Sequence, residues 1–231
     1  MKDIKSKIEY IKNNIMTIAK NVERNPEDIL LLGVTKTVDV NVIQEAIESG
    51  ITEVGENKPQ ELQRKYDVIG DKVKWHQIGS LQTNKVKYII DKVTLIHSLD
   101  RISLAEEIQK RAELCDLNIE CLVQVNISGE ETKHGLKKNE VEGFIRECSK
   151  RFDRIKIVGM MTMAPFDADD NEIRKVFKGL KDLSEYILTL GIKGVEMREL
   201  SMGMSQDYKI AIEEGATIVR IGTSIFGSRN K

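Results

Sequence analysis

Short, almost continuous apolar runs alternate with longer amphipathic stretches along the chain, and each run ends at a few polar or glycine residues. Such a run is typical of a parallel strand that is buried on both faces, and the amphipathic stretches are typical of helices. Isoleucines spaced three or four positions apart in residues 4–18 indicate a leading helix. Six strands are predicted at residues 29–34, 51–54, 73–78, 93–96, 119–125 and 155–160, and two more lead into turns at 200–205 and 220–224.

Eight strand–helix units after one leading helix predict a single α/β domain over residues 1–231, a (β/α)8 TIM-type barrel with an N-terminal helix. An open, doubly wound sheet is the structural alternative. It is disfavoured because no GxGxxG or Walker pattern follows the first predicted strand.

The most informative stretch is residues 199–227, where two predicted strands each run into a turn of small residues. The predicted helix between them covers residues 206–214, with Ser205 as its N-cap and Gly215 just after its end. Turns of this kind present backbone N–H groups and hydroxyls that suit a phosphate, which in barrels commonly binds after the seventh and eighth strands. Ordinary helix capping is the alternative interpretation.

Two basic residues are predicted to face the same mouth of the barrel. Alternate residues of a strand point to opposite sides, so Lys36 shares a side with Leu32, and Arg220 shares a side with Ile218. Two cations in a partly desolvated site are costly unless an anion binds there or one of them is neutral. A neutral lysine is a nucleophile towards aldehydes. The alternatives are a surface lysine and an arginine in a structural ion pair.

Composition narrows the class of protein. The 36 basic and 37 acidic residues give a net charge of −1 and form no basic stripe, which argues against nucleic acid as a partner. Three cysteines without a CxxC spacing predict a reduced, cytoplasmic chain, and we expect neither a signal peptide nor a membrane segment. The histidines lie in separate units, so we expect them to be structural and predict no metal site.

Eight motifs occur in a fixed order along the chain. They are GVTK at 33–36, GEN at 55–57, WHQIGSLQTNK at 75–85, HSLDR at 97–101, QVNISGEETKHGL at 124–136, GMMTMAP at 159–165, LSMGMSQD at 200–207 and VRIGTSIFG at 219–227. Together they resemble the family of pyridoxal 5′-phosphate homeostasis proteins (YggS/PROSC). The resemblance covers residues 30–231 and implies a barrel similar to the N-terminal domain of alanine racemase.

This resemblance also implies a cofactor and the residues that bind it. Pyridoxal 5′-phosphate is expected as a Schiff base on Lys36, and no catalytic residue is assigned. The other expected cofactor-binding residues are Ser201, the Met202 backbone, Gly222 and Thr223 at the phosphate, Arg220 beside the pyridine nitrogen, and Asn57 in the pocket wall. One departure is Lys58-Pro59 after GEN, where many family members have a tyrosine first, and it changes the expected shape of this wall.

The predicted function is intracellular homeostasis of the cofactor without committed turnover. A cation beside the pyridine nitrogen disfavours its protonation and makes the ring a poorer electron sink. Alanine racemase offsets this with a tyrosine from a second domain across a dimer, whereas the predicted barrel uses the whole chain. We therefore expect a monomeric, non-enzymatic carrier that supplies apo pyridoxal-phosphate-dependent enzymes.

Two other functions remain open at this stage. One is a single-domain amino-acid racemase that uses the same cofactor, although no tyrosine or cysteine is evidently placed as an acid opposite Lys36. The other is a barrel enzyme that acts on a phosphorylated metabolite through a transient Schiff base on Lys36.

Overall fold

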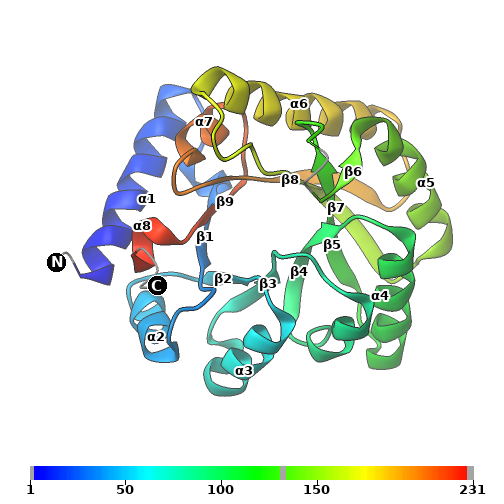
Figure 1. The fold of residues 1–231 in the computed structure, drawn as a ribbon, viewed down its shortest axis with the longest axis horizontal. Helices are drawn as coiled ribbons and strands as arrows, with labels where there is room; N and C mark the ends of the chain where they lie inside the picture. The colour runs from blue at the N-terminus through cyan, green and yellow to red at the C-terminus, as the bar shows by residue number, and fades with distance from the viewer. Residues whose placement is uncertain (1–2, 131–133, 228–231) are drawn as a thin grey trace.

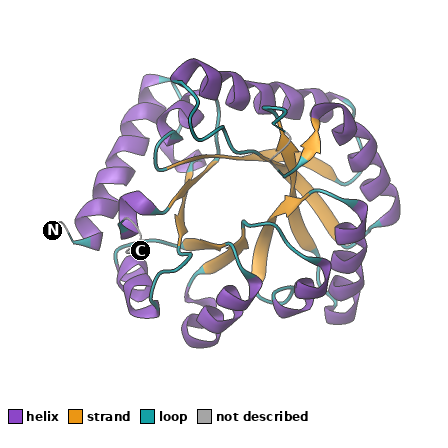
Figure 2. Ribbon diagram, in the orientation of Figure 1, coloured by secondary structure: helices purple, strands orange, loops and turns teal. Residues whose placement is uncertain are grey.

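Eight parallel strands close into a barrel in the computed structural model, which describes residues 3–130 and 134–227 (Figures 1 and 2). Neighbouring strands follow the order β4-β3-β2-β1-β9-β8-β7-β5, and pairing of β4 with β5 completes the ring. The predicted (β/α)8 fold is therefore confirmed. The strands are β1 Leu30–Val34, β2 Glu53–Glu56, β3 Lys74–Gln77, β4 Val93–Leu99, β5 Ile119–Asn126, β7 Ile155–Met161, β8 Val195–Met204 and β9 Ile218–Ile221, and the two-residue β6 Leu136–Lys137 pairs with β5 outside the ring.

Helices surround this ring (Figure 2). The predicted leading helix is α1, whose isoleucine face is buried and whose first turn is capped by the Asp3 carboxylate accepting from Ser6 N. Residues 83–88 form a 3₁₀-helix. The α-helices are α1 Ile4–Asn21, α2 Val40–Glu48, α3 Pro59–Ile69, α4 Ile102–Cys115, α5 Val141–Arg151, α6 Asp170–Thr189, α7 Tyr208–Glu213 and α8 Thr223–Phe226, and the 3₁₀-helices are η1 Pro26–Asp28, η2 Gly70–Lys72, η3 Thr83–Tyr88 and η4 Lys138–Glu140.

The core has two parts. The larger one lies between strands and helices, and a small apolar cluster lies inside the barrel. Leu32 and Ile218 belong to the inner cluster, as their predicted parity requires, whereas Val219 and Ile221 belong to the outer core. Because alternate residues of a strand face the same side, Lys36 follows the inward-facing side of Leu32, and Arg220 follows that of Ile218.

Three predicted boundaries were wrong. Strand β4 continues to Leu99, so residues 97–99 belong to the strand and not to the loop after it. Residues 200–204 continue β8 and do not form a turn, with a bulge at Gly203 (φ +89°) packed against Ala211. Helix α7 begins at Tyr208 and has Asp207 as its N-cap, although the predicted Gly215 does follow its end in a positive-φ conformation.

No helix within residues 3–130 and 134–227 combines the length and the apolar character needed to span a membrane. Across the same residues, no group of three or more His, Cys, Asp or Glu side chains could hold a metal ion.

Candidate functional site

Lys36 lies in the turn that follows β1, two residues beyond Val34, and its side chain is half-buried. The next residue, Thr37, has φ +64°, a left-handed conformation that a β-branched residue rarely adopts. Thr37 Oγ1 donates a hydrogen bond to Lys36 O at 2.6 Å. The backbone around Lys36 is therefore bent sharply, and it needs support from neighbouring residues to keep this shape.

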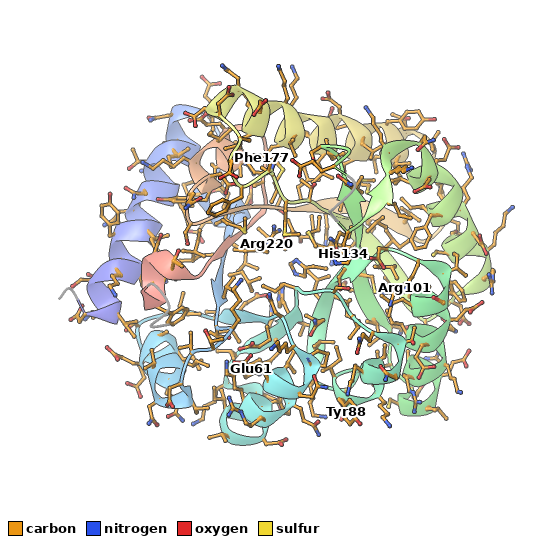
Figure 3. All side chains as sticks on the ribbon, viewed as in Figure 1. Glu61, Tyr88, Arg101, His134, Phe177 and Arg220 are labelled. Atoms are coloured by element: carbon orange, nitrogen blue, oxygen red, sulfur yellow. The ribbon has the colours of Figure 1, made fainter. Side chains whose placement is uncertain are left out.

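That support is a buried group of Thr35, Glu56, Glu61 and Lys65, here called the lysine cluster. Lys65 Nζ donates to Thr35 O at 2.6 Å, to Glu56 Oε1 at 2.6 Å and to Glu61 Oε1 at 2.9 Å. Thr35 Oγ1 donates to Glu56 Oε1 at 2.6 Å, and Thr37 N donates to Glu61 Oε1 at 2.7 Å. The residues on both sides of Lys36 are thus tied to α3 and β2, close to the labelled Glu61 in Figure 3.

Charge is distributed unevenly within the lysine cluster. Lys65 and Glu56 are fully buried, and Glu61 is 15% exposed at its side chain. Burial raises the pKa of Glu56, and its hydrogen bonds from Lys65 and Thr35 only partly oppose that effect. Burial also acts to raise the pKa of Glu61, but the bonds from Lys65 and from Thr37 N outweigh it, so that this pKa is lowered. One lysine therefore serves two carboxylates of different character.

Arg220 is the second basic residue at this end of the barrel, and Figure 3 labels it on the inner side of β9. It is 5% exposed, and its guanidinium donates from Nη1 to Ser201 Oγ at 2.6 Å and from Nη2 to Thr162 O at 2.9 Å. Burial lowers the pKa of Arg220 to about 10, although the charge of Asp207 acts in the other direction. Within the described part of the chain, no carboxylate forms an ion pair with it. A buried cation of this kind suits an acceptor atom or an anion.

Behind Arg220, hydrogen bonds run through the barrel interior. His97 Nδ1 lies 2.9 Å from Ser201 Oγ, and His97 Nε2 lies 2.9 Å from His76 Nδ1. His76 Nε2 lies 2.7 Å from Glu53 Oε2. We call Glu53, His76, His97, Ser201 and Arg220 the histidine chain.

Sequence reasoning placed the two histidines in separate units and did not single out Glu53. Strand parity is the signal that could have identified all three. Their strand neighbours Val54, Trp75 and Ile96 pack in the outer core, so Glu53, His76 and His97 point inward.

The two small-residue stretches at 200–205 and 220–224 lie next to each other, although most of their residues belong to β8, β9 and α8 and not to turns. Ser205 Oγ accepts a hydrogen bond from Ser224 N at 3.3 Å, and Met204 pairs with Arg220. Gly222 is the N-cap of α8, and Thr223 is exposed. A cavity of about 490 Å³ borders these stretches and is lined by Lys7, Tyr10, Ile11, Ser205, Gln206, Tyr208, Lys209 and Ser224.

The remaining predicted site residues take different places. Met202 packs its side chain in the outer core, so only its backbone can serve a ligand inside the barrel. Ser201 is fully buried, and its hydroxyl is already bonded to Arg220 and His97. Asn57 is half-buried directly after β2, and its carbonyl oxygen accepts from Gln77 Nε2 at 3.0 Å. A Cβ at Gly79 would lie 2.5 Å from that oxygen, so the GEN motif and Gly79 are in close contact.

The structure therefore brings the predicted residues to the carboxyl ends of strands β1, β2, β8 and β9, on one end of the barrel. Lys58 is exposed and Pro59 opens α3, so the unusual dipeptide forms the start of a helix. Residues 131–133 of the motif at 124–136 lie outside the described residues. The individual roles of the site residues stay predictions.

Comparisons with known proteins add an independent line of evidence. Residues 7–230 match the family described as "Alanine racemase, N-terminal domain". A pyridoxal phosphate homeostasis protein of Aquifex aeolicus (strain VF5) is 41% identical over 224 residues, which cover 96% of this chain and 97% of that protein. A protein of the same name from Escherichia coli (strain K12) is 34% identical over 236 residues, covering 100% of this chain and 98% of that protein.

A solved structure is also similar. PipY of Synechococcus elongatus PCC7942, with PLP bound, superposes with a TM-score of 0.81 at 28% identity, covering 93% of this chain and 100% of that one.

Proposed function

This chain belongs to the alanine racemase N-terminal domain family and, within it, to the pyridoxal phosphate homeostasis proteins, and on that premise we propose that it binds pyridoxal 5′-phosphate and serves in the homeostasis of this cofactor. The cofactor supplies an aldehyde that reacts reversibly with primary amines. The role of this chain is then to hold, protect and release it.

The observation that carries the proposal is the pair of basic residues at one end of the barrel. Lys36 offers an amine at the rim, and Arg220 lies inside as a buried cation with no ion-pair partner among the described residues. An acceptor such as a pyridine nitrogen would complete the surroundings of Arg220. The backbone N–H groups of Met202 near the end of β8 and of Gly222 and Thr223 at the start of α8 would hold the phosphate, and Asn57 would border the ring.

We further propose that the chain acts as a carrier and not as an enzyme. A guanidinium at the pyridine nitrogen keeps that nitrogen unprotonated, and the ring then stabilises carbanions poorly. Several side chains that could supply an acid are engaged elsewhere. The hydroxyls of Tyr66, Tyr186 and Tyr208 bond to Asp71, Glu142 and Asn14, and Cys121 and Cys148 lie in the outer core.

The finer features of this role are proposals as well. We propose that the chain works as a monomer in the cytoplasm and that apo enzymes that need the cofactor are its recipients. The three cysteines, all free of disulfides, support a reducing compartment.

The test of cofactor binding is the visible absorbance spectrum of the purified protein with added pyridoxal phosphate. We expect an absorbance band that borohydride removes and a reduced adduct on the peptide that contains Lys36. Lys36→Ala should lose both, whereas Lys58→Ala, an exposed lysine of the same rim, should keep both. A wild-type protein that stays colourless would refute cofactor binding.

The carrier role has a separate test in assays of racemisation and transamination on the cofactor-loaded protein. Robust turnover that disappears in Lys36→Ala would overturn the carrier proposal and favour the racemase alternative.

A further inference from the structure

The histidine chain connects the two ends of the barrel. Its Arg220 end lies at the site, and its Glu53 and His76 end lines a cavity of about 1280 Å³ bounded by the amino-terminal ends of the strands. His76 is 2% exposed, and both His97 and Ser201 are fully buried. A proton from the cavity can therefore reach the Glu53–His76 end of the histidine chain, while His97 and Ser201 in its middle are shielded from water.

The direction of each hydrogen bond in this chain follows from chemistry. A guanidinium can only donate, and an ionised carboxylate can only accept. With both imidazoles neutral, His76 Nε2–H donates to Glu53, His97 Nε2–H donates to His76 Nδ1, and the Ser201 hydroxyl donates to His97 Nδ1. Ser201 Oγ then accepts from Arg220. This is the arrangement that satisfies every link with neutral rings.

One added proton at the Glu53–His76 end reverses these bonds. His76 Nδ1–H now donates to His97 Nε2, because two N–H groups cannot face each other at 2.9 Å. His97 must then carry its proton on Nδ1 and donate it to Ser201 Oγ. The reversal is the same whether the proton between His76 and Glu53 lies on the Nε2 atom or on the Glu53 oxygen. It leaves the Ser201 hydroxyl hydrogen free for another acceptor.

The surroundings direct the added proton to this end of the chain. Burial, together with the charges of His76 and Arg220, keeps the pKa of His97 well below its ordinary value. Burial acts to raise the pKa of Glu53, but the hydrogen bonds and charges of His76 and Lys74 outweigh it, so that this pKa is lowered and Glu53 stays ionised. The other hydrogen-bond partner of His76 is therefore a carboxylate, which places a negative charge at this end of the histidine chain.

Other charged groups around the cavity largely balance one another. Arg198 of β8 pairs with Glu120 of β5 and with Glu199, and Lys74 of β3 donates to Glu53 at 3.1 Å. Equal numbers of basic and acidic side chains line the cavity. Those from α1 and the residues after it are Lys12, Lys20, Arg24, Glu27 and Asp28.

We infer that His76 and His97 are positioning residues for the cofactor site: protonation at the Glu53–His76 end reverses the hydrogen bonds through His97 and frees the Ser201 hydroxyl hydrogen for an acceptor beside Arg220. This inference rests on the proposed function, because that function places the cofactor next to Arg220, whose guanidinium donates to Ser201. It adds a dependence of cofactor binding on the proton supply at the opposite end of the barrel.

The first test observes the imidazoles of the cofactor-free protein directly. Long-range ¹H–¹⁵N NMR spectra distinguish the two tautomers of a histidine ring. As the pH is lowered from about 8 to about 5, we expect His97 to change from the Nε2–H to the Nδ1–H tautomer. The Glu53→Gln variant should shift this transition to lower pH. Glu120→Gln removes a carboxylate that lines the same cavity but does not belong to the histidine chain. It should leave the pH of the tautomer transition unchanged.

The second test measures binding of pyridoxal phosphate to the wild type and to His97→Gln across the same pH range. Both proteins share Lys36 and the ionisation of the cofactor, so the ratio of their dissociation constants isolates the histidine chain. We expect wild-type binding to strengthen relative to the variant by about tenfold from pH 8 to pH 5.5, as one added hydrogen bond implies.

A single His97 tautomer over the whole pH range, or a constant ratio of dissociation constants, would overturn the inference. The NMR measurement needs no cofactor, so failure of the proposed function would show separately as absence of pyridoxal phosphate binding.

Discussion

The lysine cluster and the histidine chain both support a basic residue of the site, but they do so in different ways. In the lysine cluster, opposite charges touch directly, with Lys65 Nζ 2.6 Å from a Glu56 oxygen on the outer side of the barrel wall. In the histidine chain, the charges of Arg220 and Glu53 are kept apart by two imidazoles and a hydroxyl. Both groups are almost entirely buried.

This difference separates two tasks. Direct ion pairs in a buried place are costly to break, so the lysine cluster holds the backbone on both sides of Lys36 in one conformation. A row of neutral groups that both donate and accept can reverse its direction at little cost, so the histidine chain can respond to a proton. The Lys36 side of the site is built for fixed geometry, and the Arg220 side is built for adjustment.

The largest effect is expected from Lys65→Met, which removes the only cation of the lysine cluster. Glu56, Glu61 and the carbonyl oxygen of Thr35 would lose their shared donor, and such a loss destabilises a protein by about 3–5 kcal/mol. Urea denaturation at pH 7 measures the free energy of unfolding. The loss should be smaller at pH 5. Burial raises the pKa of Glu56, and without Lys65 this carboxyl would bind a proton more tightly in the folded variant than in the unfolded chain.

A matched control is Lys181→Met on α6. Its Nζ lies 3.9 Å from Glu185, and the two side chains are 45% and 64% exposed, so the change should cost less than about 0.5 kcal/mol. Equal losses for the two lysine variants would show that the lysine cluster has no special role in stability.

A smaller effect is expected at the far end of the histidine chain. Glu53→Gln should lower the free energy of unfolding by about 1–2 kcal/mol at pH 7, because a charge-assisted bond to His76 becomes a neutral one. The pKa of Glu53 is lowered in the folded state, so its contribution is present above the unfolded-state value of about 4.5 and is lost as the pH falls below it.

Urea denaturation from pH 7 to pH 3.5 checks this sign. The wild-type and Glu53→Gln curves should converge at the acid end, and Glu120→Gln serves as the control for removing a carboxylate from the same cavity. A difference that persists undiminished at pH 3.5 would contradict the role given to Glu53.

The same contrast explains how much could be predicted from the sequence. The strands and their order followed from continuous apolar runs such as residues 29–34, because parallel strands buried on both faces need such runs. Lys36 and Arg220 followed from side-chain parity and the family resemblance. Their shared end of the barrel is confirmed by the fold, because both follow inward-facing positions at the carboxyl ends of neighbouring strands.

The polar interior was the part that sequence reasoning missed. His97 and Ser98 were assigned to a loop because polar residues interrupt the apolar run, yet both belong to β4, and His97 points into the barrel. Pairing of His76 with His97, and of His97 with Ser201 104 positions away, depends on strand register and on the barrel diameter. No local pattern in a single sequence encodes these distances. In the sequence, the polar residues of a buried network therefore look like the end of a strand.

The smallest effect tests whether the lysine cluster acts through the backbone alone. Thr37 is exposed and holds φ +64°, and asparagine tolerates this conformation better, so Thr37→Asn should raise the free energy of unfolding by about 0.5–1 kcal/mol. The N–H of residue 37 would still donate to Glu61, so affinity for pyridoxal phosphate should stay within about twofold of the wild type. That change is smaller than the loss of one neutral hydrogen bond would cause.

Glu23→Asn, at an exposed residue with φ +57° far along the chain from Lys36, is the control and should give a similar gain in stability. If Thr37→Asn weakened binding tenfold while Glu23→Asn left it unchanged, the Thr37 side chain and its bond to Lys36 O would be what positions Lys36, and the contrast between a fixed and an adjustable half of the site would have to be redrawn.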